Sequence, residues 1–328
     1  MMRALAADRL GPPEVYEVRE LPVPVPGEGE VLLRVEATGL GYVDALIAAG
    51  GYQHRPEPPY VPGAEIVGTI ERLGPGAQEW SIGDRVASWQ LLAGGGLAEY
   101  AVARGRTLVR VPASLDARVA AGSLLDPLTA WYALHDRGGL CAGEAVLVLG
   151  ASGGVGAAAV RIAASFGARV IAAASTSSKR ERALEAGAEL AIDYMASDWR
   201  DVLRSHAPCG IDVVVDPVGG AIFEPAFRSL AKGGRHLVLG FAGGEVPRLP
   251  ANLPLLKNGM LVGADARDCF ERSPARAIQI WDQVFARLAS GQLRSADPWL
   301  HTFEQAQASL SDALLRHKRG KIVVDVDR

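Results

Sequence analysis

The chain has 328 residues, of which 49% are hydrophobic and 22% charged, and its formal net charge is −3. This length predicts about two domains, and the composition is typical of a globular protein with a large core. The weakly negative charge argues against nucleic acid as a partner, and no apolar run reaches the ~18 residues of a membrane span. Three widely spaced cysteines, Cys141, Cys209 and Cys269, give neither a disulfide framework nor a metal-ligand pattern. Since no long apolar stretch opens the chain, we expect a cytoplasmic enzyme that does not bind membranes.

Residues 1 to about 120 have the pattern of a β-rich unit. Short apolar runs such as Val31–Val35 alternate with turn sequences such as Pro24–Gly27 and Leu73–Gly76. One helix is expected among them at Tyr42–Ala48, and a second from about Pro127 through Leu134.

From Ala145 to about Gly263, apolar strands alternate with helices. Strands are expected at 145–149, 170–174, 212–216 and 235–240, and helices at 157–164, 179–186 and 223–230. This alternation predicts a doubly wound parallel sheet with helices on both faces, an α/β fold.

The last part of the chain has helices near 276–289 and 304–316 and then a closing strand at 321–326. No helix follows this strand, so we expect it to return to the sheet of the first domain. The predicted domains are therefore a discontinuous one, 1–123 with 264–328, and a second one at 124–263 that is inserted into it.

A glycine-rich turn lies between the strand at 145–149 and the helix that follows it, with the residues Gly150, Ala151, Ser152, Gly153, Gly154, Val155 and Gly156. Strand, glycine turn and helix together form the context in which such a motif binds a dinucleotide. Gly153 and Gly156 would let the backbone approach a pyrophosphate and let the helix pack closely on the sheet. The first N–H groups of the helix would then face the phosphates. The alternative is an ordinary tight turn.

The end of the next strand bears on the choice of cofactor. Chains that bind NAD usually carry an acidic residue about 20 positions after the glycines. Here hydroxyl residues at 175–178 are followed by Lys179 and Arg180, and no carboxylate occurs before Glu181. Hydroxyls and cations suit a 2′-phosphate, so the pattern favours NADPH. Alternatively, the hydroxyls only cap a helix that has both cations on its polar face.

Several short motifs occur in order along nearly the whole chain: Gly39–Asp44, Pro62–Glu65, Gly83–Val86, Gly96–Tyr100, Leu128–Ala130, the glycine turn, Asp216–Gly220 and Gly320–Val323. As an ordered set they resemble the medium-chain dehydrogenase/reductase superfamily, specifically its zinc-independent, zeta-crystallin-like NADPH:quinone oxidoreductase branch. The resemblance implies a GroES-like β-barrel catalytic domain and a Rossmann domain. It also implies an active site in the cleft between the two domains, and a homodimer.

The same resemblance assigns cofactor contacts outside the glycine turn. It places Thr129 near the nicotinamide or its ribose, and Gly240 with Phe241 against the nicotinamide side. It assigns the adenosine 2′-phosphate to Ser175, Lys179 and Tyr194. The alternatives are a helix-surface hydroxyl for Thr129, a turn glycine for Gly240 and a half-buried strand-end aromatic for Tyr194.

Zinc is not expected. Zinc-dependent relatives have a histidine before the glutamate of the motif Pro62–Glu65, where this chain has Ala64. A catalytic zinc needs three protein ligands. The histidines fall in no ligand spacing and are expected to be surface or packing residues: His54, His135, His206, His236, His301 and His317.

The expected chemistry without a metal is hydride delivery from NADPH to a small electrophile. By the resemblance, Tyr52 matches the tyrosine that enoyl thioester reductases use as an acid; the alternative is a loop aromatic that shapes the pocket. The family usually has an asparagine at the position of Gly41. Tyr42 or a water could replace it, although packing alone could also explain Tyr42. Asp44 is expected to fix the geometry of this segment.

Three functions remain open. The first is a quinone reductase, and the second is a double-bond reductase acting on enoyl thioesters or α,β-unsaturated carbonyls, which Tyr52 favours. The third is a low-turnover NADPH-binding redox sensor, which the missing asparagine at Gly41 favours.

Overall fold

Two groups of β-strands organise the chain, each within its own unit. The computed structural model describes residues 1–53, 55–315 and 320–327. One unit consists of Met1–Leu125, Trp281–Gly291 and Ser295–Arg328, and the other of Asp126–Ile280 and Gln292–Arg294. The boundaries fall at the start of α3 (Leu125–Trp131) and within α10 (Pro274–Ala289). The domain limits given by the sequence pattern, 1–123 with 264–328 and 124–263, stay a prediction.

The first unit is built on a seven-stranded sheet with the order β14-β15-β3-β4-β5-β7, in which β6 also pairs with β3. A separate antiparallel pair joins β1 to β2. The strands are β1 (Met2–Ala6), β2 (Glu17–Leu21), β3 (Glu30–Leu40), β4 (Glu65–Leu73), β5 (Arg85–Trp89), β6 (Tyr100–Arg104), β7 (Val109–Arg110), β14 (Trp299–Thr302) and β15 (Ile322–Asp325). The helical segments are η1 (Pro13–Val15), α1 (Tyr42–Ala48), η2 (Gly105–Thr107), α2 (Ala117–Ala121), η5 (Phe303–Gln305) and α11 (Ala306–Leu314).

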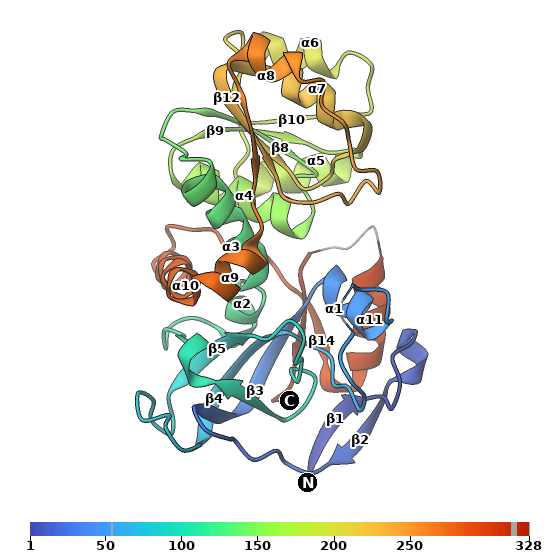
Figure 1. Cartoon of the computed structure of the whole chain (residues 1–328), viewed down its shortest axis with the longest axis vertical. Coiled ribbons are helices and arrows are strands. Elements are labelled where there is room, and N and C mark those ends of the chain that lie inside the picture. Colours follow the sequence, from blue (N-terminus) through green and yellow to red (C-terminus); the bar gives the residue numbers. More distant parts are fainter. Residues whose placement is uncertain (54, 316–319, 328) are drawn as a thin grey trace. The chain divides into compact units, whose positions relative to one another are not determined.

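The end of the chain completes this unit. Strand β15 pairs antiparallel with β3, which confirms the predicted return of the closing strand. Helix α11 packs beside α1, so that red and blue segments lie side by side in Figure 1. Arg316, the last residue of the helix expected here, lies outside the described residues.

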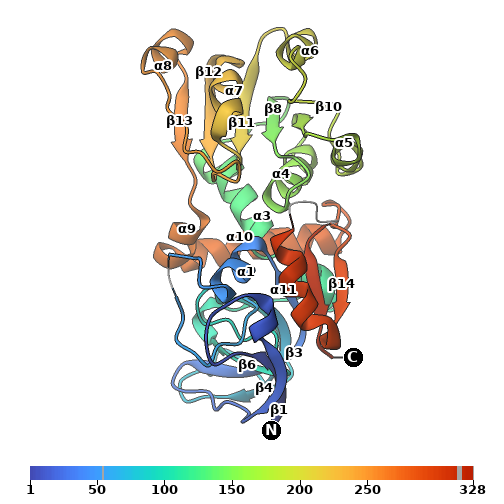
Figure 2. The same cartoon turned by 90° about the vertical axis from the view of Figure 1, so that its right-hand side faces the viewer.

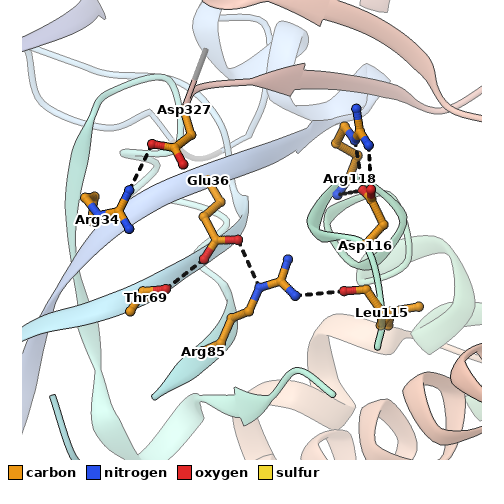
Figure 3. Close-up of polar contacts among 8 residues, drawn as sticks. All are labelled: Arg34, Glu36, Thr69, Arg85, Leu115, Asp116, Arg118 and Asp327. Carbon is orange, nitrogen blue, oxygen red and sulfur yellow. Dashed lines mark hydrogen bonds and ion pairs between the residues drawn. The ribbon is translucent and has the colours of Figure 1, made fainter. Parts of the chain in front are cut away.

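Charged side chains surround a cavity of about 460 Å³ at one end of β15. Glu36 accepts hydrogen bonds from the Thr69 hydroxyl, at 2.7 Å, and from Nε of Arg85, at 2.9 Å. Arg85 also donates to the carbonyl oxygen of Leu115. These contacts, drawn in Figure 3, join β3, β4 and β5 to the segment before α2. The acidic and basic groups therefore neutralise one another across the sheet.

Asp116 lines the same cavity and is the N-cap of α2. Its carboxylate accepts the backbone N–H of Arg118 and the Nε of the same arginine, each at 2.8 Å. The side-chain hydrogen bond from Arg118 lowers the pKa of Asp116 to about 2. Asp116 is therefore a charged N-cap at neutral pH, a favourable position for an anion.

The second unit is built on six parallel strands with the order β10-β9-β8-β11-β12-β13, which Figure 2 shows fanned out from β13. They are β8 (Ala145–Leu149), β9 (Arg169–Ala173), β10 (Leu190–Ile192), β11 (Ile211–Asp216), β12 (Leu230–Val238) and β13 (Met260–Gly263). All five residues of β8 are buried. Helices cover both faces of a parallel sheet, so its central strands are continuous apolar runs. The predicted parallel sheet is confirmed.

Helices and helical turns complete this unit: η3 (Tyr132–Arg137), α4 (Gly154–Ser165), α5 (Ser177–Glu185), α6 (Trp199–His206), η4 (Gly220–Ile222), α7 (Phe223–Arg228), α8 (Asn252–Lys257) and α9 (Ala266–Arg272). Of these, α4, α5 and α7 match the helices predicted at 157–164, 179–186 and 223–230, whereas α6, α8 and α9 were not predicted. The predicted helix from Pro127 through Leu134 is α3 followed by the π-helical turn η3. Among the described residues, no helix combines the length and apolarity needed to cross a membrane.

Candidate functional site: the carboxyl edge of the parallel sheet

The glycine turn follows β8 at the carboxyl edge of the parallel sheet. Gly150 has φ +58°, a left-handed conformation that favours glycine. A Cβ on Gly156 would lie 2.3 Å from the carbonyl oxygen of Gly150, so α4 can approach the turn this closely only without a side chain there. The predicted packing role of Gly156 follows from this contact.

Gly153 differs from Gly156 in its surroundings. It precedes α4 as its N-cap with φ −75°, and an added Cβ would meet only the Gly150 carbonyl oxygen, at an ordinary 3.4 Å. No neighbouring protein atom therefore demands a glycine at this exposed position. The backbone at Gly153 is thus uncovered just before the first N–H groups of a twelve-residue helix, a position that suits the pyrophosphate of a dinucleotide. Ser152 lies in the same turn, whereas Gly154 and Val155 are the first residues of α4, and a Cβ on Gly154 would lie 2.3 Å from the Asp126 carboxylate.

A second loop at this edge follows β11 and is held from within. One Asp216 oxygen accepts the N–H groups of Val218 and Gly219, at 2.7 and 2.8 Å. The other accepts Nε2 of His236, at 2.9 Å, and both side chains are fully buried. Nδ1 of His236 makes no hydrogen bond to the described residues. A buried carboxylate is stable only when paired in this way, so His236 supports the Asp216 turn.

The Asp216 turn contacts the neighbouring loops on both sides. A Cβ on Gly150 would come within 2.8 Å of the Val218 side chain. A Cβ on Gly219 would come within 3.0 Å of the Phe241 ring, and Gly219 has φ +65°. The glycine turn, the Asp216 turn and the loop of Gly240 and Phe241 thus form one continuous edge. The Phe241 side chain remains 43% exposed there.

The residues predicted to hold a 2′-phosphate come from three neighbouring segments. Ser175 follows β9, Lys179 lies in the first turn of α5 and Tyr194 follows β10. Strands β8, β9 and β10 are adjacent in the sheet, so their carboxyl ends bring these segments to the side of the glycine turn. Thr176 is the N-cap of α5, and its hydroxyl accepts the N–H of Lys179. The expected capping and a phosphate site are therefore compatible.

Thr129 lies on α3 and is 9% exposed. It is therefore more buried than the helix-surface hydroxyl that was the alternative. Its proposed contact with the nicotinamide stays a prediction.

The candidate substrate residues belong to the other unit. Tyr42 begins α1 and is 54% exposed. Tyr52 is partly buried and packs against the apolar core of its unit. This packing agrees with a pocket-shaping role for Tyr52, and its role as an acid stays a prediction.

A buried charge cluster under Gly41 was not predicted in full. Asp44 accepts the N–H groups of Gly41, at 2.8 Å, and Ala64, at 2.9 Å, which is the geometric role expected for it. Burial raises the pKa of Asp44, and the positive charge of Lys321 and these hydrogen bonds oppose that shift. Lys321 forms an ion pair with Glu65, whose other oxygen accepts the N–H of Leu125.

The sequence contains a signal for part of this cluster. An acidic residue in the first turn of an apolar helix, as Asp44 is, often accepts the N–H at the helix start. Nothing local indicates that Lys321 meets Glu65, because the two are far apart in the chain. The Gly41 backbone has φ −112°, and a Cβ there would lie 3.5 Å from Lys321 Nζ and 3.5 Å from Asp44. Neither the backbone conformation nor the neighbouring side chains therefore require a glycine at position 41.

The described residues contain no group of three or more histidine, cysteine or acidic side chains that could hold a metal ion. His236 and His301 are buried, and each lies beside a carboxylate, that of Asp216 and that of Asp312 respectively. His54 and His317 lie outside the described residues.

Two glycine substitutions separate packing from ligand contact. Gly156→Ala should lower both the unfolding temperature and dinucleotide affinity, because its Cβ meets backbone at 2.3 Å. Gly153→Ala should weaken dinucleotide binding about tenfold yet shift the unfolding temperature by no more than about 2 °C. Calorimetry and fluorescence titration measure the two effects. Unchanged binding in Gly153→Ala would mean that the open space is not occupied by the ligand.

The Lys321–Glu65 pair should behave as a coupled unit. Lys321→Met should destabilise the protein by about 3–5 kcal/mol, because it leaves the buried Glu65 without its partner. Adding Glu65→Gln, which keeps an acceptor for Leu125, should recover much of that loss. The control, Arg267→Met, breaks the exposed Arg267–Glu271 pair and should cost less than about 1 kcal/mol. Denaturant unfolding gives these values, and strictly additive effects of the two cluster substitutions would contradict the coupling.

Comparison with known proteins agrees with this geometry. The family model for the alcohol dehydrogenase GroES-like domain matches residues 27–113, and the one for zinc-binding dehydrogenase matches residues 154–283. The human quinone oxidoreductase is 34% identical over 245 residues, which are 74% of each chain.

Solved structures with the same fold match nearly the full length of the chain. A mycobacterial quinone oxidoreductase superposes with a TM-score of 0.90 at 30% identity, covering 99% of this chain and 100% of its own. A mycobacterial protein complexed with NADPH superposes with a TM-score of 0.86 at 30% identity and the same coverage. The chain therefore belongs to the quinone oxidoreductase-like branch of the medium-chain dehydrogenase/reductase superfamily, with a GroES-like and a Rossmann-type part, and is an oxidoreductase with a nicotinamide cofactor.

Proposed function

We propose that this enzyme uses NADPH to reduce a quinone, without a metal ion. The support for the quinone is the likeness to the human and mycobacterial quinone oxidoreductases. The support for NADPH is the first turn of α5, where hydroxyls and Lys179 occur without a carboxylate, and the NADPH complex of a relative. The observation that carries the proposal is this turn, which lies beside the open glycine turn at one sheet edge.

The residues at the sheet edge fit a dinucleotide. Gly153 leaves room for a pyrophosphate at the start of α4, and the two other loops extend the edge toward Phe241. Bound NADPH would supply a hydride. In this proposal Ser175, Lys179 and Tyr194 hold the 2′-phosphate through charge-assisted and neutral hydrogen bonds. Thr129, Gly240 and Phe241 lie along the nicotinamide part.

Reduction of a quinone requires few catalytic groups from the protein. A quinone that accepts a hydride can take its proton from water, so no side-chain acid is required. We propose that the exposed Tyr42 and the partly buried Tyr52 form an apolar surface that orients the quinone ring. Zinc-independence is part of the proposal, and it is supported by Ala64 in the place of a ligand histidine.

Binding titrations test the cofactor, and a panel of substrates tests the substrate. NADPH should bind at least about tenfold tighter than NADH, equivalent to one charge-assisted contact, and Lys179→Ala should narrow this gap. NADPH oxidation should be fast with 1,4-benzoquinone and 9,10-phenanthrenequinone and slower with enones and crotonyl thioesters. Equal affinities for NADPH and NADH would contradict the cofactor assignment.

The same panel distinguishes the other functions. Faster turnover of enones or enoyl thioesters, lost selectively in Tyr52→Phe, would indicate a double-bond reductase instead. Tight NADPH binding without turnover of any substrate would indicate a redox sensor. Unchanged activity after dialysis against a strong chelator is expected, and its loss would contradict metal independence.

We further propose a homodimer formed through β13. This strand ends the sheet order, so one of its edges has no partner strand among the described residues. Apolar side chains are exposed on it and on the preceding helix: Met260 is 51% exposed, Leu261 46%, Leu255 80% and Leu256 60%. An exposed apolar edge strand is a surface that another strand pairs with readily. A second copy of β13 would extend the sheet and cover these side chains.

Light scattering after gel filtration tests the dimer. The unmodified chain should have twice the monomer mass, and Leu261→Lys should shift it to the monomer by placing a charge in the interface. Val25→Lys is the control, because Val25 is 75% exposed in the other unit. A monomeric unmodified chain, or a dimer that survives Leu261→Lys, would contradict the proposal.

A further inference from the structure

Arg180, which the sequence pattern grouped with Lys179, makes different contacts from those expected of a phosphate ligand. Its Nη1 donates to the carbonyl oxygen of Ala174, at 3.2 Å, and pairs with the Asp193 carboxylate, at 2.9 Å. The side chain is 24% exposed and that of Asp193 is 35% exposed, so the pair is partly shielded from water. The guanidinium therefore points at a carbonyl and a carboxylate.

These contacts join the three segments that carry the proposed 2′-phosphate ligands. Ala174 precedes Ser175, Asp193 precedes Tyr194, and Arg180 follows Lys179. Asp193 also closes a turn around Tyr194, since its other oxygen accepts the N–H of Met195 at 2.9 Å. One guanidinium thus connects the end of β9, the first turn of α5 and the end of β10.

The charge of Asp193 makes the pairing important for specificity. A carboxylate on the residue next to Tyr194 would repel a phosphate dianion held by Tyr194 and Lys179, because charges interact over ~8 Å at physiological salt. Bound to Arg180, its negative charge is compensated. The same carboxylate without Arg180 would favour a ribose hydroxyl over a phosphate.

We propose that Arg180 is a specificity-determining residue that acts through Asp193 and does not bind the phosphate itself. It neutralises the carboxylate and holds it against Ala174, so that Lys179 supplies the cation for the phosphate. This inference rests on the proposed preference for NADPH. Arg180 is a positioning residue and takes no part in hydride transfer.

The test is a set of dissociation constants for NADPH and NADH, measured by fluorescence titration of the full chain. Arg180→Met keeps the length of the side chain and removes its charge. It should weaken NADPH binding about tenfold or more and change NADH binding by less than about threefold, because only NADPH carries the repelled phosphate. Adding Asp193→Asn should restore NADPH binding to within about threefold of the unmodified chain. The asparagine oxygen still accepts the N–H of Met195, so the turn around Tyr194 is kept.

Arg182→Met is the matched control, since it removes a positive charge from the same helix. It should leave the ratio of the two dissociation constants within about twofold, which excludes a general effect of net charge. Unfolding temperatures of all variants establish that they fold.

Two results would overturn the inference. If the double variant binds NADPH as weakly as Arg180→Met, Arg180 contacts the phosphate directly. If Arg180→Met weakens NADPH and NADH equally, the residue only supports the local fold. The proposed function is tested separately, because a preference for NADPH that Lys179→Ala reduces would stand under either result.

Discussion

The ion pair between Lys321 and Glu65 is the interaction on which the first unit depends. Both side chains are buried, and the second oxygen of Glu65 accepts the N–H of Leu125 at 2.8 Å. Three stretches far apart in the chain therefore meet at one carboxylate. A buried charge is tolerated only with its partner in place. The buried Glu65 therefore requires that the start of α3 and the returning strand β15 are both in place. Exposed ion pairs, by contrast, stabilise a fold little.

The second unit depends on close backbone approach. Gly156 brings α4 to within contact of the Gly150 carbonyl, and the buried Asp216–His236 pair holds the next turn against the same glycine. The loops at the carboxyl edge are thus rigidly supported from inside the sheet. A ligand that binds there meets preformed N–H groups and loses little free energy in ordering them.

The two units differ in how strongly the fold determines the residues of their candidate sites. At the sheet edge, Gly150 and Gly156 have defined geometric reasons to be glycine, and the proposed cofactor follows from the hydroxyl and lysine residues beside them. Around Gly41 the constraint is looser, because a side chain there would meet Lys321 and Asp44 only at ordinary contact distance. In the proposed function, substrate choice therefore rests on a position that the fold leaves open, whereas cofactor choice rests on segments that the strand order brings together.

Sequence patterns were enough to predict the parallel sheet, the glycine turn, the lack of an acidic residue before Glu181 and the return of the closing strand. Each of these follows from local patterns: apolar periodicity, turn residues and spacing along the chain. The folded chain was needed to show that Lys321 pairs with Glu65, that His236 supports Asp216, and that Arg180 rather than Lys179 binds Asp193. These partners are distant in the chain or are brought together by strand order. No local sequence pattern indicates which of the neighbouring cations, Lys179 or Arg180, pairs with Asp193 in the folded chain.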